Sequence, residues 1–200
     1  MNIEQTIKEL KAKPILFKTD MVRAILEDRK TETRRIIKPQ YQHSNGEIWT
    51  SIKKNNWMHQ GKIENCESLL KVCPYGKPGK YLWVRETWCN DPHENVIYLY
   101  REQEKYPEYY KWKPSIYMPK SACRLILKIE DLRVERIQDI TEESAVNEGI
   151  TLPNYAEQAI KDVKYPEPSW IFEDLWIKIN GQKSWDINYW VWRIKFLKYI

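Results

Sequence analysis

The 200-residue sequence lacks the signals that mark secreted and membrane-spanning proteins. Its N-terminal stretch, Met1 to Lys13, is polar and charged, which excludes the apolar core of a secretory signal. No apolar run approaches the roughly 20 residues that a membrane-spanning helix needs. We therefore expect a soluble chain in the cytoplasm that makes no contact with a membrane.

Closely spaced metal ligands are lacking as well. The cysteines form no Cys-x-x-Cys pair and the histidines have no ligand spacing; they are Cys66, Cys73, Cys89, Cys123, His43, His59 and His93. A tetrahedral zinc site usually shows closer pairs of ligands. We therefore expect no metal, no cofactor, and thiols that stay reduced.

The chain does have a globular composition with a large aromatic share and a mild excess of positive charge. Hydrophobic residues make up 42% of it, charged residues 30% and aromatic residues 13%, and its net charge is +5. The aromatic residues can form a core or a stacking surface. The charge is compatible with a polyanionic partner but does not require one.

Alternating apolar and polar residues predict several strands. The clearest pattern runs from Ala122 to Ile140, and its phase slips by one residue, which predicts a bulge or bend at Glu130 and Asp131. Other strands are predicted at residues 14–17, 33–38, 81–88, 96–100 and 191–199. Two short helices are predicted, one capped by Thr19 and one capped by Thr141 with Gly149 just past its end.

Three polar or weakly periodic stretches, near residues 40–73, 90–119 and 151–186, are predicted to be insertions. We expect a small hairpin in the first and an amphipathic segment, from Trp170 to Ile179, in the last. The remaining elements include too few crossover helices for a parallel sheet. We therefore expect one α+β domain over residues 1–200, built as a small, mostly antiparallel β-barrel with helices at its rim.

The most informative stretch is Asp28 to Arg35, which follows a predicted amphipathic helix and leads into a predicted strand. It holds one amine, two hydroxyls and three guanidinium groups. Rigid elements on both sides of such a junction can aim polar groups into a cleft. The alternative interpretation is a solvated charged turn, which the wider pattern of the sequence disfavours.

This cluster, Asp28-Arg29-Lys30-Thr31-x-Thr33-x-Arg35, is followed by a Gly79-Lys80-x-Leu82-x-Val84 strand and a final apolar strand. That order resembles the ASCH domain family. The blocks at residues 82–88, 112–119 and 185–192 resemble the longer members typical of bacteriophages and prophages. The resemblance implies a PUA-like β-barrel, a fold with many relatives that recognise modified bases.

Small bacterial members of the ASCH family are similar to N4-acetylcytidine amidohydrolases, and the resemblance implies a catalytic set of Lys30, Thr33 and Glu148. Cleaving such an amide needs a nucleophile, a proton acceptor and a stabilised oxyanion. In this hypothesis Thr33 attacks, and Lys30 accepts its proton because burial and neighbouring guanidinium groups lower the lysine pKa. Glu148, near a helix C-terminus, gives a proton to the leaving amine. The simpler alternatives are a solvated lysine, a strand threonine and a helix-end carboxylate.

A second group of residues is predicted to bind substrate or nucleic acid: Arg29, Arg34, Arg35, Trp83, Arg85, Glu86 and Trp88. The guanidinium groups of Arg35 and Arg85 suit phosphate or base contacts, and the alternative is an ion pair with Glu86 or Glu32. The two tryptophans can stack on an unpaired base or pack in the core.

Three functions are left open by the sequence. The leading one is binding of RNA or a modified nucleoside in a basic, aromatic-lined cleft. In the second, the same cleft is an amidohydrolase site that deacylates N4-acylated cytidine. In the third, the chain is a phage accessory protein whose insertions bind a host protein.

Overall fold

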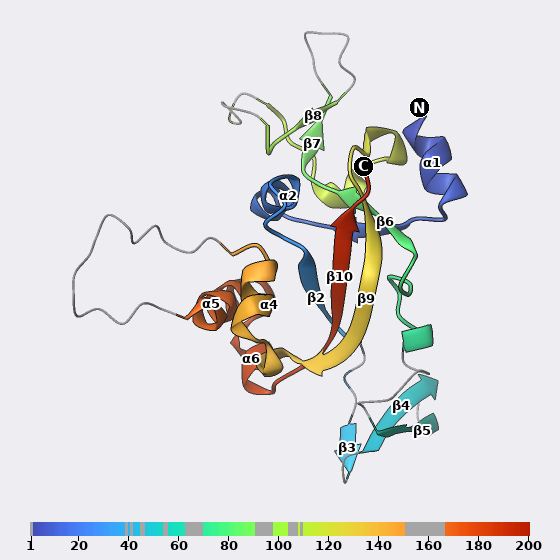
Figure 1. Cartoon of the computed structure of the whole chain (residues 1–200), viewed down its shortest axis with the longest axis vertical. Coiled ribbons are helices and arrows are strands. Elements are labelled where there is room, and N and C mark those ends of the chain that lie inside the picture. Colours follow the sequence, from blue (N-terminus) through green and yellow to red (C-terminus); the bar gives the residue numbers. More distant parts are fainter. Residues whose placement is uncertain are drawn as a thin grey trace, which may run out of the picture. The chain divides into compact units, whose positions relative to one another are not determined.

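The computed structural model describes residues 2–38, 40, 42–44, 47–53, 56–62, 70–90, 98–103, 108, 110–150 and 167–200. Their elements are α1 (Ile3–Glu9), β1 (Lys13–Leu16), α2 (Thr19–Leu26), β2 (Glu32–Ile36), β3 (Gln42–Ser44), β4 (Glu47–Lys53), β5 (Asn56–Lys62), β6 (Tyr81–Arg85), β7 (Trp88–Cys89), β8 (Leu99–Tyr100), η3 (Ser115–Tyr117), η4 (Lys120–Ala122), β9 (Ile126–Arg136), η5 (Ile137–Asp139), α4 (Glu142–Asn147), α5 (Pro168–Asn180), α6 (Gln182–Asp186) and β10 (Trp190–Lys198). Helices and sheets both contribute (Figure 1), so the predicted α+β class is confirmed.

The largest sheet has five strands in the order β1-β6-β9-β10-β2. It is mixed, because β1 pairs in parallel with β6 while β6 pairs antiparallel with β9. The registers join Ile15 to Val84 and Leu82 to Leu127, all of them buried apolar residues. Among the described residues this sheet does not close into a barrel, so the structure establishes a mixed sheet with helices.

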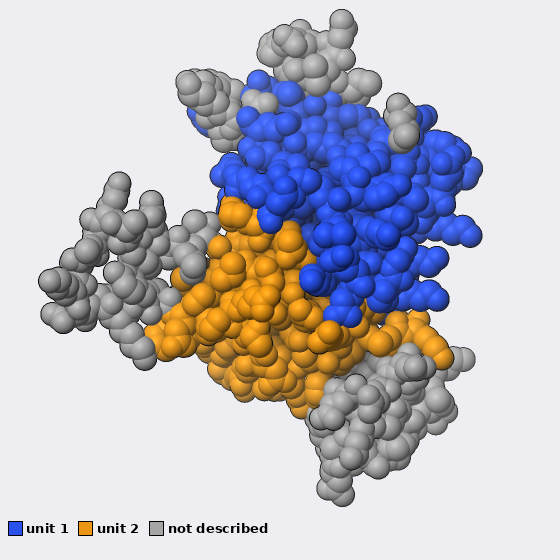
Figure 2. Space-filling model, in the orientation of Figure 1, with its two compact units in different colours: residues 1–28, 73–131, 195–200 blue, residues 29–72, 132–194 orange. Residues whose placement is uncertain are grey.

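The chain divides into two compact units, coloured separately in Figure 2. Unit 1 comprises residues 1–28, 73–131 and 195–200, and unit 2 comprises residues 29–72 and 132–194. The strands β9 and β10 contribute residues to both. Each unit buries apolar side chains of its own, which we describe in turn.

In unit 1, α1 packs its apolar side against the sheet residue Trp83. Ile7 of this helix, Trp83, Cys123 and Ile126 form one buried cluster. The helix is absent from the sequence predictions, although Asn2 caps it by accepting a hydrogen bond from the Glu4 amide at 3.0 Å. An asparagine before an apolar pattern is a recognisable helix start, so the signal was available.

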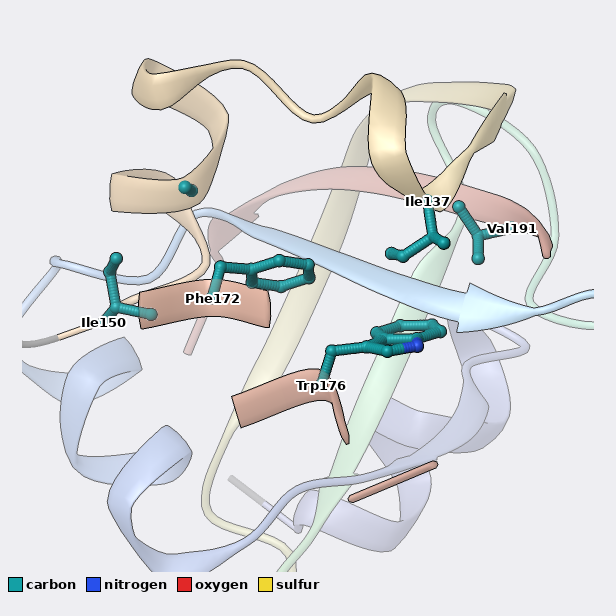
Figure 3. Packing of buried hydrophobic residues seen from close by; sticks show 6 residues of the cluster. Ile137, Ile150, Phe172, Trp176 and Val191 are labelled. Carbon is teal, nitrogen blue, oxygen red and sulfur yellow. The ribbon is translucent and has the colours of Figure 1, made fainter. Parts of the chain in front are cut away.

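In unit 2, α4, α5 and the strand β10 share a core (Figure 3). Its buried members are Ile137, Ala145, Ile150, Phe172, Trp176 and Val191. Phe172 and Trp176 lie one helical turn apart on α5, so both rings face the same side. The indole Nε1 of Trp176 donates a 2.9 Å hydrogen bond to Ser184 Oγ, which satisfies the one polar atom of that ring.

Two helix caps and one irregular strand were predicted from local sequence. The Thr141 cap is confirmed, since its side chain accepts a hydrogen bond from the Ser144 amide and Gly149 follows with a φ of 79°. The Thr19 cap is wrong, because the N-cap of α2 is Lys18 and no side chain caps it. The strand β9 continues through Glu130 and Asp131. The alternation of buried and exposed side chains shifts by one residue at this point.

The predicted insertions contain more regular structure than expected. Residues 42–62 carry the three-stranded antiparallel sheet β3-β4-β5, where a small hairpin was predicted. The predicted amphipathic segment is the helix α5, which supplies two aromatic side chains to the core of unit 2. Residues 151–166, the first part of the last predicted insertion, lie outside the described residues.

Candidate functional site

Backbone pairing brings the start of β2 to the end of α4 within unit 2. Lys30 and Glu148 form an isolated antiparallel bridge, and the Thr31 amide donates a 2.8 Å hydrogen bond to the Asn147 carbonyl. Glu148 is the C-cap of α4, and Gly149 ends the helix with its positive φ. The helix cap therefore fixes the glutamate beside the lysine, although 118 residues separate them in the chain.

The Lys30 ammonium is in direct contact with Glu148, and we call these two residues the Lys30–Glu148 pair. The Nζ atom donates to Glu148 Oε2 at 2.5 Å and to the Glu148 carbonyl oxygen at 2.7 Å. Lys30 is 1% exposed and Glu148 is 5% exposed, so water screens the contact poorly. A solvated lysine, the simpler alternative, is therefore wrong.

Arg34 extends the pair into a larger network of buried and partly buried charges. Its Nη1 donates to Glu148 Oε1 at 3.2 Å, and its Nε donates to Glu135 Oε1 at 2.7 Å. Its Nη1 also lies 3.7 Å from a carboxylate oxygen of Glu32, which in turn accepts two hydrogen bonds from Arg193. Three cations thus meet three carboxylates, so the formal charges within this network balance.

Burial lowers the pKa of Lys30 below its ordinary value of 10.5. Loss of water around the ammonium is the largest cause, and the nearby charges of Arg35 and Arg34 act in the same direction. The carboxylate of Glu148 opposes this shift without cancelling it. A buried amine of lowered pKa accepts and returns a proton more readily than a solvated lysine does.

Thr33, the third predicted catalytic residue, is buried in β2 between Glu32 and Arg34. Successive side chains of a strand point to opposite faces, so the Thr33 hydroxyl lies on the other face from these two charged neighbours. Within the described part of the chain, no hydrogen bond is recorded from Thr33 to Lys30 or Glu148. Two of the three predicted catalytic side chains are therefore in contact.

Two further predicted arginines lie near the pair, both in unit 2. Arg29 is exposed, and its Nη1 donates a 3.2 Å hydrogen bond to the carbonyl of Gly149, the residue after Glu148. Arg35 is half-buried and is one of the charges that lower the pKa of Lys30. Of the predicted arginines in this unit, Arg34 belongs to the buried network, whereas Arg29 is open to solvent.

The four remaining predicted residues belong to unit 1, where they pack against other side chains or take part in hydrogen bonds. Trp83 is 5% exposed and Trp88 is 6% exposed, which agrees with the packing alternative. The Arg85 guanidinium lies 5.3 Å from the Trp83 ring centroid and donates to the Ile116 carbonyl. Glu86 is 1% exposed and accepts two hydrogen bonds from a guanidinium outside this predicted set.

The alternative interpretation, an ion pair of Arg35 or Arg85 with Glu86 or Glu32, named the wrong arginines. Glu86 is bound by Arg124, at 2.9 and 2.8 Å, and Glu32 is bound chiefly by Arg193. Arg124, Glu135 and Arg193 were all missed by the sequence analysis. Their partners are between 38 and 161 residues away in sequence, so no local pattern signals these contacts.

Among the residues that the structure describes, no group of three or more His, Cys, Asp or Glu side chains is arranged to hold a metal ion. Cys73, Cys89 and Cys123 are buried thiols. The side chains of Cys66 and of the three histidines lie outside the description. In the same described part, every helix is too short or too polar to span a bilayer.

Comparison of the chain with family models, with curated proteins and with solved structures finds no match. The chemistry of the Lys30–Glu148 pair is thus known only from the sequence and the geometry of the chain itself.

Proposed function

We propose that this chain is an ASCH-type protein of PUA-like architecture that hydrolyses the amide of an N4-acylated cytidine at the Lys30–Glu148 pair. The observation that carries the proposal is the complete burial of an ammonium 2.5 Å from a carboxylate oxygen. A buried charged pair adds little to stability relative to apolar side chains, whereas proton transfer benefits from such an environment. The α+β class and the resemblance of the Asp28–Arg35 cluster support the same assignment.

The proposed chemistry assigns each proton to a named atom. Lys30 Nζ, as the neutral amine, accepts the proton of the attacking hydroxyl while a new bond forms to the acyl carbon. The bond from that carbon to N4 of cytosine then breaks, and the proton returns through the Lys30–Glu148 pair to the leaving amine. The net reaction consumes one water and gives cytidine and a carboxylic acid.

The attacking hydroxyl belongs either to Thr33 or to a water molecule, and substitution of Thr33 distinguishes the two. If Thr33 forms a covalent acyl intermediate, Thr33→Val abolishes turnover and Thr33→Ser retains part of it. If water attacks directly, both variants keep turnover, because the Lys30–Glu148 pair is intact. The position of Thr33 on the opposite face of β2 from Arg34 favours the second outcome.

The direct test is conversion of N4-acetylcytidine to cytidine, followed by chromatography. Wild-type protein is expected to turn the nucleoside over, and Lys30→Met to lower the rate by roughly 100-fold or more, the usual contribution of a general base. Lys178→Met is the matched control, because this lysine is exposed on α5. Equal rates in wild type and Lys30→Met, or no turnover by any protein, would contradict the proposal.

A second candidate function, binding of RNA or a modified nucleoside without turnover, is favoured by Arg29. This arginine is exposed next to the pair and can contact a phosphate without leaving its backbone anchor at Gly149. Binding through phosphate predicts an affinity that falls steeply with added salt. A salt-dependent affinity that survives Lys30→Met, in the absence of any cytidine product, would select this function over hydrolysis.

A further inference from the structure

A short turn in unit 1 exposes two large apolar side chains side by side in sequence. Ile116 is 58% exposed and Tyr117 is 71% exposed, whereas the next residue, Met118, is 1% exposed. Both exposed residues lie on the 3-10 turn η3. Scattered apolar side chains are common on protein surfaces, so the surroundings of this pair decide its meaning.

The turn is held in place from both ends. Met118 packs with Trp88 and Ala122, and its sulfur accepts a hydrogen bond from the Glu86 amide at 3.1 Å. At the other end, Lys113 and Trp88 exchange backbone hydrogen bonds of 2.8 and 3.3 Å. An exposed pair on an anchored turn loses little conformational entropy when it binds a partner.

The middle of the turn is anchored as well. The Arg85 guanidinium donates to the carbonyl of Ile116, and the Tyr117 amide donates to the Pro114 carbonyl at 3.0 Å. The backbone is thus held by hydrogen bonds at both exposed residues. This is the arrangement of a preformed contact surface.

The segment that carries the exposed pair is rich in positive charge. Lys111, Lys113 and Lys120 are all exposed, and the sequence between residues 110 and 120 contains no aspartate or glutamate. The Lys113 ammonium lies 4.6 Å from the centroid of the Trp88 ring, which restrains one of the three charges. An aromatic ring close in sequence to several cations is complementary to a negatively charged polymer that carries flat apolar rings.

We propose that this surface, Lys111 to Lys120, binds single-stranded nucleic acid, with Tyr117 stacking on a base and the lysines contacting phosphates. It lies in unit 1, and the Lys30–Glu148 pair lies in unit 2, so the proposal does not depend on the proposed hydrolysis. The apolar part is limited to two side chains among three cations, which favours a polyanion over an apolar protein surface.

The test is fluorescence anisotropy of a labelled oligouridine and of the matching DNA strand with the full chain. Tyr117→Ala is expected to weaken binding by about tenfold, the usual effect of removing a stacking platform. The matched control is Tyr199→Ala, because Tyr199 is 49% exposed and also belongs to unit 1. Lys30→Met is expected to bind as the wild type does, even if it has lost hydrolysis.

Salt dependence provides a second, independent readout. Replacing both Lys113 and Lys120 by glutamine is expected to reduce the slope of log affinity against log salt by roughly 0.7 for each lost phosphate contact. Lys178→Gln and Lys183→Gln, both exposed in unit 2, are expected to leave the slope unchanged.

Three outcomes would overturn the proposal. The first is absence of oligonucleotide binding, and the second is equal loss in Tyr117→Ala and Tyr199→Ala. The third is Tyr117-dependent binding to vesicles of anionic phospholipid without binding to either oligonucleotide, which would assign the surface to a membrane.

Discussion

In unit 1, the Glu86 carboxylate accepts two hydrogen bonds from one guanidinium, that of Arg124, at 2.9 and 2.8 Å. In unit 2, the Glu148 carboxylate is divided between the ammonium of Lys30 at 2.5 Å and the guanidinium of Arg34 at 3.2 Å. The two acids are similarly buried, at 1% and 5% exposure. The difference between them is the chemical nature of the cation.

The guanidinium of Arg124 keeps its proton at any physiological pH, so the cation of this pair has one charge state, although burial raises the pKa of the Glu86 carboxyl. The same guanidinium lies 4.2 Å from the centroid of the Tyr100 ring, and burial raises the pKa of Tyr100 to about 12. Neither Arg124 nor Tyr100 therefore titrates near neutrality. This combination is typical of a structural ion pair.

The Lys30 amine can lose its proton, and burial lowers its pKa below the ordinary value of 10.5. Similar burial thus accompanies a cation that keeps its proton in unit 1 and a cation of lowered pKa in unit 2. We infer that lysine, in place of arginine, separates a functional pair from a structural one in this chain. The predictions that follow test this contrast, beginning with the largest effect.

Glu148→Gln is expected to lower the free energy of unfolding by about 3–5 kcal/mol, because it leaves a buried ammonium without its counter-ion. Urea unfolding followed by circular dichroism measures the change. Glu143→Gln is the control, since Glu143 is exposed on the same helix, and we expect a change below about 1 kcal/mol. Equal effects of the two substitutions would show that the buried contact is energetically unimportant.

Glu86→Gln is expected to lower the free energy of unfolding by about 2 kcal/mol, less than Glu148→Gln. Arg124 keeps a second carboxylate in this variant, because its Nη2 also donates to Glu102 at 3.2 Å. The same urea experiment applies, combined with the cytidine assay. Loss of hydrolysis in a folded Glu86→Gln protein would remove the distinction drawn between the two pairs.

Stability is expected to depend on pH through Lys30. Between its lowered folded-state pKa and 10.5, the unfolded chain holds a proton that the folded chain does not, so the free energy of unfolding rises with pH in that window. The slope from one such group is at most about 1.4 kcal/mol per pH unit. The free energy of unfolding is measured for wild type and for Lys30→Met at several pH values. The difference between the two slopes is the contribution of Lys30, because the other groups contribute to both proteins.

The double variant Lys30→Met with Glu148→Leu is expected to be within about 1.5 kcal/mol of wild type in unfolding free energy, much closer than Glu148→Gln. Removing both charges leaves no buried ion unpaired. The same protein is expected to have no hydrolytic activity. A stable but inactive double variant supports a functional role, whereas a severely destabilised one indicates that the pair holds the fold together.

Local sequence patterns were sufficient to predict the parts of the fold that depend on neighbouring residues. The alternation in β9, the Thr141 cap and the positive φ of Gly149 are of this kind. The Thr19 cap failed because the extended residue that begins α2 is Lys18, a position that side-chain chemistry alone does not reveal.

The site was predictable only in part, for a related reason. Lys30 and Glu148 were identified through a family resemblance, while Glu135 and Arg193 lie 101 and 161 residues from their partners. Such contacts form when β2 enters the sheet beside β10, and periodicity along the chain carries no information about that pairing. The burial of Trp83 and Trp88 likewise follows from tertiary packing.

The most direct test of the account is a nitrogen-15 NMR titration of the Lys30 side-chain amine, identified by the signal missing from Lys30→Met. The account predicts that Lys30 titrates at a lower pH in the folded protein than in the urea-unfolded chain, because burial disfavours its charged form. A folded-state midpoint equal to or above the unfolded one would contradict it.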